Sequence, residues 1–196
     1  MDLPEKILIC GLGSIGSFYL RLIKNKWPNI RIAILRSGLG DSDNNYEILS
    51  EAIFTNISDA INWRPNASII SSPAPFHLEQ ALIFSKVGIP ILIEKPIGVP
   101  FQKEKLWDEL VSISKNNVIY VGYILRMEPC ANLIKDYLNN KYIGNIIEAD
   151  FYSGSWLPDW RPEKDFRKTV SARKELGGGV LLELSHEIDM ALWLFG

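Results

Sequence analysis

Residues 11–16, with the sequence GLGSIG, fit the pattern G-x-G-x-x-G, which binds dinucleotides when it joins a strand to a helix. In that setting Gly11 makes the tight turn, Gly13 lets the backbone approach a pyrophosphate, and Gly16 lets helix and strand pack closely. The N-terminus of the helix, at Ser14 and Ile15, supplies N–H donors and a positive dipole end for the phosphates. The pattern therefore predicts a dinucleotide site, and a plain glycine-rich turn is the alternative.

Arg36 and Ser37 indicate which dinucleotide this turn would bind. Arg36 lies 20 positions after Gly16, where NAD-binding enzymes usually place an acidic residue on the ribose 2′-hydroxyl. A guanidinium cannot accept from that hydroxyl, but it can bind a 2′-phosphate through two hydrogen bonds and can stack on adenine. We therefore expect NADP as the cofactor, with NAD less favoured. A solvated arginine is the alternative, and Asp41 and Asp43 could still serve a hydroxyl.

A stretch rich in aromatic and basic residues, 156–175, could bind a sugar. Rings such as those of Trp156 and Trp160 can stack on the C–H faces of a sugar. Residues 161–175 contain six Lys or Arg, beginning with Arg161, against three acids, so this segment carries a net positive charge. That charge could attract an anionic substrate, such as a nucleotide-linked sugar or a sugar acid. A solvated loop is an equally supported alternative.

The composition is that of a globular protein, with 196 residues of which 47% are hydrophobic and 22% charged. The net charge of -2 gives no global attraction to nucleic acid or to an anionic membrane, so we expect neither as a partner. Two cysteines without metal-ligand spacing indicate reduced thiols and no metal site. Because the chain shows neither a signal peptide nor an apolar run of about 18 residues, we expect a cytoplasmic protein without a membrane span.

The elements that would position these residues alternate between strand and helix over the first 123 residues. Apolar runs and residues at helical spacing predict strands at 6–10, 30–35, about 53–54, 67–71, 89–93 and 118–123. The predicted helices are 14–26, a short helix from Ser58, 77–86 and 101–115. The Ser58 hydroxyl can cap the short helix. Right-handed crossovers then give a Rossmann-type, doubly wound parallel sheet, an α/β fold in which ligands bind beyond the carboxyl ends of the strands.

The pattern changes after Tyr123, and we expect the beginning of an α+β substrate domain. The remainder predicts a helix at about 129–139, a strand at 146–151, an irregular stretch at 154–179 and a final helix from about Val180. The length allows one complete domain and part of another. We therefore expect an NAD(P)-binding domain over 1–123 and a partial catalytic domain over 124–196, cut off within an apolar helical pattern.

Further motifs show that the chain resembles the Gfo/Idh/MocA family, named after glucose-fructose oxidoreductase and myo-inositol dehydrogenase. Besides the glycine turn, these are Pro73-x-x-x-His77, Glu94-Lys95-Pro96 with Gly88 before it, Gly122-Tyr123 with Arg126, and the segment from Gly177-Gly178-Gly179 to His186 and Asp189. The resemblance implies an NAD(P)-dependent oxidoreductase that transfers a hydride to or from a sugar or nucleotide-sugar derivative. Residues 156–175 look like those of members associated with surface-polysaccharide biosynthesis.

In the family, the lysine of the Glu-Lys-Pro tripeptide lies between the nicotinamide and the substrate hydroxyl, which implies a catalytic role for Lys95. An ammonium at that place stabilises the developing alkoxide while a hydride leaves, and Glu94 can hold the ammonium in position. A surface Glu-Lys pair is the alternative. The resemblance also places Ser72, Pro73 and His77 near the nicotinamide, where His77 could equally be structural.

The resemblance further implies that His186 is the general base, since an imidazole can take a hydroxyl proton near pH 7. Many members carry an aspartate four residues before this histidine, where this chain has Leu182. Glu183 could share a helix face with His186 and either orient it or touch the substrate. We expect Asp189 to orient His186 and, with Arg126, to belong to the substrate site. A buried core histidine is the alternative.

Two other functions stay open. One is a catalytically silent dinucleotide-binding protein, because family members carry a large open sheet after this point that walls the substrate site and builds the oligomer. Where that sheet is present we expect a homo-oligomer. The other is a related Rossmann reductase acting on a tetrapyrrole or amino-acid intermediate, against which the pair of Lys95 and His186 argues.

Overall fold

The computed structural model describes residues 3–38, 44–100, 102, 104–160, 162–163 and 165–196. It divides the chain into two units, Met1–Val121 and Gly122–Gly196, whereas the sequence places the division two residues later, after Tyr123. The first unit holds a parallel sheet, and the second consists of helices and turns. Within the described residues, no helix is long and apolar enough to cross a lipid bilayer.

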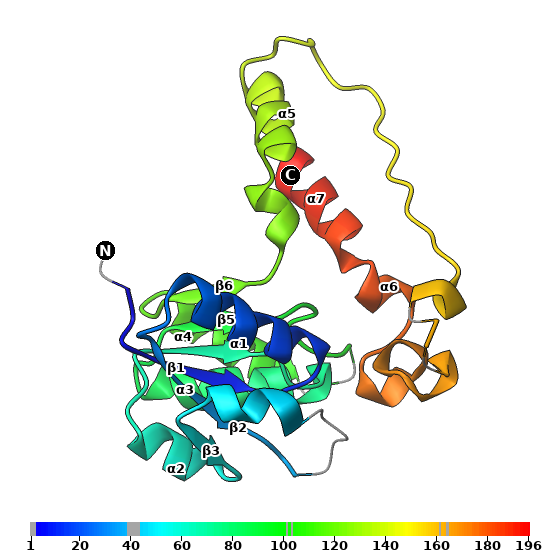
Figure 1. The fold of residues 1–196 in the computed structure, drawn as a ribbon. Helices are drawn as coiled ribbons and strands as arrows, with labels where there is room; N and C mark the ends of the chain where they lie inside the picture. The colour runs from blue at the N-terminus through cyan, green and yellow to red at the C-terminus, as the bar shows by residue number, and fades with distance from the viewer. Residues whose placement is uncertain (1–2, 39–43, 101, 103, 161, 164) are drawn as a thin grey trace. The chain divides into compact units, whose positions relative to one another are not determined.

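The first unit is built on six parallel strands in the order β3-β2-β1-β4-β5-β6 (Figure 1). The strands are β1 (Lys6–Cys10), β2 (Arg31–Leu35), β3 (Ala52–Phe54), β4 (Ala67–Ile70), β5 (Ile91–Ile93) and β6 (Ile119–Val121). Isoleucine and leucine dominate them, which suits strands that are buried on both faces. The predicted doubly wound parallel sheet is confirmed.

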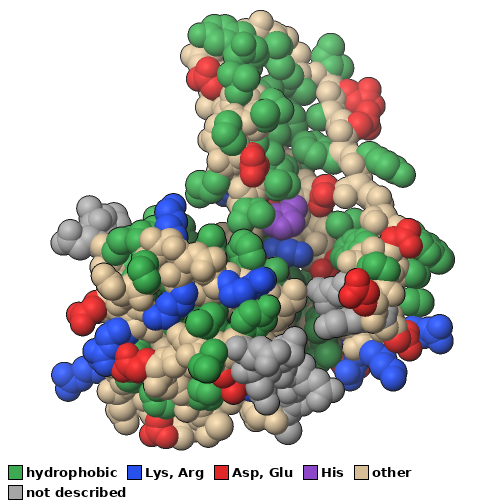
Figure 2. All heavy atoms as spheres, viewed as in Figure 1, with side chains coloured by type: hydrophobic (Ala, Val, Ile, Leu, Met, Phe, Trp, Pro, Cys, Tyr) green, Lys and Arg blue, Asp and Glu red, His purple; other side chains and the backbone are tan. Residues whose placement is uncertain are grey.

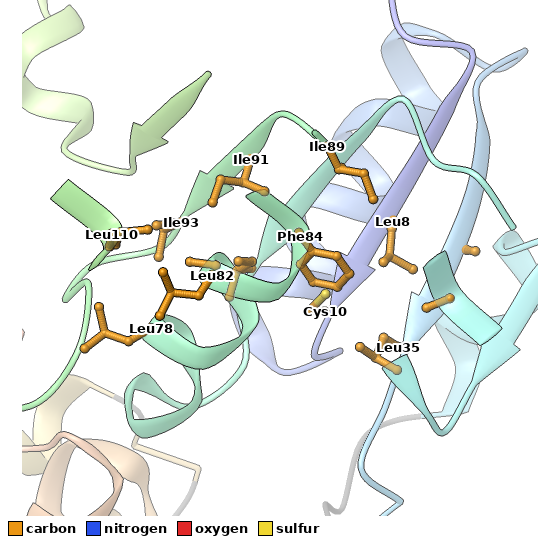
Figure 3. Close-up of a cluster of buried hydrophobic side chains, with 14 residues drawn as sticks. Leu8, Cys10, Leu35, Leu78, Leu82, Phe84, Ile89, Ile91, Ile93 and Leu110 are labelled. Atoms are coloured by element: carbon orange, nitrogen blue, oxygen red, sulfur yellow. The ribbon is translucent and has the colours of Figure 1, made fainter. Parts of the chain in front are cut away.

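Helices connect the strands and cover both faces of the sheet. They are α1 (Ser14–Lys26), α2 (Ile57–Asn62), α3 (His77–Lys86) and α4 (Glu104–Ser114). Successive strand residues point to opposite faces, so Leu8 packs in a core cluster with Phe84 of α3, shown in Figure 3. Ile9 belongs to a second cluster, with Leu20 of α1. Both faces of β1 are therefore buried.

The structure corrects some predicted boundaries. The cap of α2 is Asn56 and not Ser58, since the Asn56 side chain accepts a hydrogen bond from the Asp59 N–H at 2.8 Å. The helix begins at Ile57, so Ser58 lies inside its first turn. Strands β4, β5 and β6 are shorter than predicted, because their flanking residues leave the ladder for the turns. Phe101, the predicted start of the helix observed as α4, lies outside the described residues.

The second unit begins with the 3₁₀ turn η3 (Ile124–Met127) and α5 (Pro129–Asn139), as predicted for 129–139. Short 3₁₀ turns follow, and the unit ends with α6 (Val180–Glu183) and α7 (Ser185–Phe195). The predicted single helix from Val180 is wrong, because Leu184 has φ and ψ of -102° and 30° and separates two helices. Figure 2 shows hydrophobic side chains exposed over this unit. Leu133 and Tyr137 of α5 are exposed.

The strand predicted at 146–151 does not form. Residues 145–155, part of the yellow stretch in Figure 1, make no backbone hydrogen bond to another part of the described chain. The side chain of Ile147 is 99% exposed. A strand needs a neighbour to satisfy its N–H and C=O groups, and the described residues of this unit supply none. The local sequence of 146–151 does not specify such a neighbour.

Candidate active site

The strand order of the first unit reverses between β1 and β4, which pair directly although β2 and β3 separate them in the sequence. In open parallel sheets, ligands bind outside the carboxyl ends of the strands at such a reversal. The residues that directly follow β1, β2, β4 and β5 are Gly11, Arg36, Ser71 and Glu94. The residues predicted to bind a dinucleotide therefore gather at one edge of the sheet.

The glycines at this edge are required by close backbone contacts. Gly11 has φ of +88°, and a Cβ on it would lie 2.8 Å from the Cα of Ser72. A Cβ on Gly16 would lie 2.0 Å from the carbonyl oxygen of Gly11. Ser71 closes the turn, since its hydroxyl can donate to the Gly11 carbonyl at 3.0 Å. Strand β1, the turn and α1 thus pack with no room for side chains at these two positions.

Gly13 differs, because a Cβ on it would meet nothing within 4 Å. It is the N-cap of α1 and provides no side-chain cap, and the first turn of the helix carries no acidic residue. The first amides of a helix have no intrahelical acceptor, and Ser14 and Ile15 are exposed. Open space, N–H donors and the positive end of the helix dipole together fit the pyrophosphate of a dinucleotide.

Arg36 is fixed at the carboxyl end of β2. Its N–H donates to the carbonyl of Phe54 at 2.9 Å, and its guanidinium forms an ion pair with Glu47, a residue that the sequence reasoning did not single out. Ser37 is exposed beside it. Of the other predicted ribose contacts, Asp41 and Asp43 lie outside the described residues.

His77 is almost completely buried, with 2% of its surface exposed. Its Nε2 lies 2.6 Å from the Ser72 carbonyl and its Nδ1 lies 2.7 Å from the Pro96 carbonyl, so the ring joins the turns after β4 and β5. Burial lowers the pKa of His77, although the hydrogen bonds to the two carbonyls act in the opposite direction. A neutral ring donates to one of these carbonyls at a time. His77 therefore braces the two turns. Pro73, in the turn after β4, is exposed.

Glu94 and Lys95 are held by Tyr19, which comes from α1. The Tyr19 hydroxyl donates to Glu94 Oε1 at 2.5 Å, and Glu94 Oε2 accepts from the backbone N–H of Lys95 at 3.2 Å. Burial, and then the hydrogen bond to Glu94, raise the pKa of Tyr19. The peptide bond between Lys95 and Pro96 is cis. Sequence reasoning missed Tyr19, although a tyrosine within an otherwise apolar helix stripe was a signal for a buried hydroxyl that needs a partner.

The second unit brings together other predicted site residues. The rings of Tyr123 and His186 meet edge to face, with centroids 5.6 Å apart. Arg126 binds Asp189 through two hydrogen bonds, from Nε to Oδ2 at 2.8 Å and from Nη2 to Oδ1 at 2.5 Å. The carboxylate of Asp189 raises the pKa of Arg126. Because both oxygens of the buried Asp189 accept from Arg126, the structure pairs these two residues with each other and pairs His186 with Tyr123.

Glu183 does not share a continuous helix with His186, and the aromatic stretch lies in the second unit. Glu183 ends α6, whereas His186 lies in α7, so the offset of three does not put them on one helix face. Trp156 is exposed, Trp160 ends the 3₁₀ turn Leu157–Trp160, and Arg161 lies outside the described residues. Among the residues that the structure describes, no three His, Cys, Asp or Glu side chains gather to hold a metal ion.

Residues 5–123 match the model of a family described as "Oxidoreductase family, NAD-binding Rossmann fold". Levoglucosan dehydrogenase of Pseudarthrobacter phenanthrenivorans is 30% identical over 129 residues, which cover 65% of this chain and 32% of that protein. The chain spans about half of the curated relatives that it matches, between 32% and 56% of their length.

Two solved structures share the fold. Scyllo-inositol dehydrogenase from Lactobacillus casei, with bound NAD(H) and scyllo-inositol, superposes with a TM-score of 0.74 at 23% identity, covering 98% of this chain and 56% of that one. The WlbA dehydrogenase from Bordetella pertussis, in complex with NADH and UDP-GlcNAcA, gives a TM-score of 0.72 at 18% identity, covering 100% of this chain and 56% of that one.

Proposed function

The chain belongs to the Gfo/Idh/MocA family of oxidoreductases with an NAD-binding Rossmann fold, and from this membership we propose that it transfers a hydride between a nicotinamide dinucleotide and a hydroxyl or keto group of a sugar derivative. Its relatives include dehydrogenases of levoglucosan and inositol. These names support a polyhydroxylated substrate, because enzymes that share a site usually share the class of group on which they act.

The observation that carries the proposal is the network joining the glycine turn to Lys95. The turn opens α1, and Tyr19 of the same helix donates to Glu94, which in turn accepts from the Lys95 backbone. A lysine held at the edge of the sheet that fits a dinucleotide suits a reaction in which cofactor and substrate must be brought together.

We assign two residues to the chemistry. When bound, a nicotinamide dinucleotide supplies the hydride acceptor in oxidation and the donor in reduction. The Lys95 ammonium would stabilise the negative charge that develops on the substrate oxygen. His186 would take the hydroxyl proton in oxidation and return it in reduction, and the edge of Tyr123 would orient its ring. Glu183 is a further candidate for orienting His186 or touching the substrate.

The cofactor preference depends on Arg36. Its guanidinium supports NADP, since it can bind a 2′-phosphate through two hydrogen bonds. Glu47 pairs with Arg36 and supports NAD, because it offsets the positive charge that would attract the phosphate. Because of Arg36, we propose NADP as the cofactor, with NAD less favoured.

The substrate is proposed to be a sugar or a nucleotide-linked sugar, in surface-polysaccharide biosynthesis. Trp156, Arg167 and Lys168 are exposed in the stretch 156–175, and they support an anionic, ring-bearing substrate. The complex of WlbA with UDP-GlcNAcA supports the same class of substrate. Two free cysteines support the cytoplasm as its location. The exposed side chains of Ile188, Leu192 and Phe195 on α7 support a homo-oligomer.

A silent dinucleotide-binding protein is the second candidate. It is favoured by residues 145–155, whose backbone makes no hydrogen bond to another part of the described chain, so that these residues contribute no strand to the open sheet that walls the substrate site in family members. The first unit would then bind the cofactor without turnover.

A turnover assay with matched variants separates these candidates. The full chain is incubated with NAD or NADP and a panel of alditols, inositols and nucleotide sugars, and absorbance is followed at 340 nm. Turnover should be lost in Lys95→Ala and His186→Ala and kept in Lys86→Ala, which changes an exposed lysine of α3. Binding of nucleotide without turnover on any substrate would contradict the oxidoreductase proposal and favour the silent protein.

A further inference from the structure

Glu47 lies beside the residue that the sequence assigns to the ribose of the cofactor. Arg36 directly follows β2, and its guanidinium forms an ion pair with the Glu47 carboxylate. The two side chains are only 17% and 21% exposed, so the pair is largely shielded from water. A carboxylate therefore lies at the carboxyl end of β2, although it comes 31 positions after Gly16 and not the usual 20 or so.

The 3₁₀ helix η1 (Asn44–Leu49) holds Glu47 in this place. The ring of Tyr46 packs against the core cluster that contains Leu20 of α1, and the guanidinium of Arg21 lies 5.0 Å from the centre of that ring. Ser50 donates to the Glu47 carbonyl from its N–H at 2.9 Å and from its hydroxyl at 2.6 Å. Tyr46 thus anchors the turn on one side of Glu47, and on the other the Glu51 N–H donates to the Ile32 carbonyl of β2 at 2.7 Å.

A second Arg–Glu pair, at the other end of β2, is more exposed than the pair of Arg36 and Glu47. Arg31 opens β2 and pairs with Glu51 at 2.5 Å, with side chains 44% and 39% exposed. That pair lies at the amino end of the strand, whereas ligands bind at the carboxyl ends. Water screens exposed pairs, so they contribute little, while the shielded Glu47 acts on Arg36 through a medium that screens charge less.

We propose that Glu47 selects between the two nicotinamide cofactors. Its carboxylate neutralises the charge of Arg36 and repels a 2′-phosphate, whereas it can accept a hydrogen bond from a 2′-hydroxyl. The inference rests on the proposed function, since it concerns the cofactor that Arg36 would contact. A phosphate dianion at this edge has to share the guanidinium with Glu47 or displace it. A hydroxyl carries no charge and can donate to the carboxylate. Arg36 alone would favour NADP, and Glu47 shifts the preference towards NAD.

The test is the affinity of the full chain for NAD and for NADP, measured by isothermal titration. Glu47→Gln removes the charge and keeps the shape, and it should strengthen NADP binding about tenfold, or about 1.4 kcal/mol, with NAD changed by less than about threefold. Glu47→Asp keeps the charge, and Glu51→Gln removes the charge of the exposed pair at the other end of β2. In both of these controls the ratio of the two affinities should stay within about threefold of the native ratio.

The outcomes separate this inference from the proposed function. Native chain that binds neither nucleotide overturns both. If the native chain binds a nucleotide, the role of Glu47 is overturned when Glu47→Gln changes both affinities in parallel, leaves both unchanged or weakens NADP binding. The proposed function stands in each of these cases. Glu47→Ser replaces Glu47→Gln in the same titration if circular dichroism shows the glutamine variant unfolded.

Discussion

Removing the hydroxyl of Tyr19 tests the network that holds Lys95. In the native protein this hydroxyl donates to Glu94 Oε1 at 2.5 Å, across 75 positions of sequence. Hydrogen bonds to charged groups contribute about 1.5–3 kcal/mol, and water can partly replace the lost donor because Tyr19 is only half-buried. We therefore expect Tyr19→Phe to lower the free energy of unfolding by about 1–2 kcal/mol.

Urea unfolding followed by circular dichroism measures this loss, and a double-mutant cycle isolates the contact. Glu94→Gln, Tyr19→Phe and the double variant should give a coupling energy of about 1–2 kcal/mol, since both single changes weaken the same hydrogen bond. Tyr120→Phe is the matched control, because Tyr120 is an exposed tyrosine on β6 of the same sheet. It should change the free energy of unfolding by less than about 0.5 kcal/mol.

The result that would refute this reasoning is additivity. If the two changes add without coupling, or if Tyr19→Phe costs no more than Tyr120→Phe, then the hydroxyl does not hold Glu94. Lys95 would in that case be positioned by its own turn alone.

Three further predictions concern the glycine turn, His77 and the second unit. A Cβ on Gly16 would lie 2.0 Å from the Gly11 carbonyl oxygen, so Gly16→Ala should cost more than about 2 kcal/mol in urea unfolding, and near-native stability would contradict the packing. The folded-state pKa of His77 lies below its unfolded value of about 6.5, so unfolded chains bind more protons and stability falls as the pH drops below that value. His77→Gln should flatten the dependence of unfolding free energy on pH between 7 and about 5, and an unchanged slope would exclude His77 as its source. Arg126→Ala leaves the buried Asp189 carboxylate without its two donors. It should lower the free energy of unfolding by about 1–3 kcal/mol, a range reduced because Arg126 is partly exposed, and Asp189→Asn should lower it by less. Equal losses in these two variants would argue against an unpaired charge as the cause.

Local pattern was sufficient to predict the order of strands and helices in the first unit, although not all of their boundaries. The end of β1 and the start of α1 can be predicted from the sequence between them, because the glycine turn ends the strand and allows the helix to begin. The cap of α2 was harder to assign, since Asn56 and Ser58 both carry suitable oxygens and the choice depends on where the backbone becomes helical. The strand expected at 146–151 failed for a different reason, because pairing depends on a neighbour that local sequence does not specify.

The candidate site divides in the same way. Gly11, Gly16 and Arg36 are placed by their positions directly after or close to strands, which the sequence indicates. Tyr19 and Glu47 act through side-chain partners on other elements, Glu94 and Arg36, and such pairings depend on tertiary packing. Only the folded chain shows that a tyrosine holds the glutamate before Lys95 and that a glutamate pairs with the arginine that follows β2.

The most direct test of the central claim is nucleotide binding by the native chain and by Gly13→Val. A Cβ on Gly13 would meet nothing within 4 Å, so the variant should fold with little change in melting temperature. Its side chain would nevertheless fill the space through which a pyrophosphate approaches the helix N-terminus. Isothermal titration should show that the native chain binds NAD or NADP and that Gly13→Val binds at least about tenfold more weakly, or about 1.4 kcal/mol. Equal binding by a folded Gly13→Val, or no binding by the native chain, would contradict a dinucleotide site at this turn.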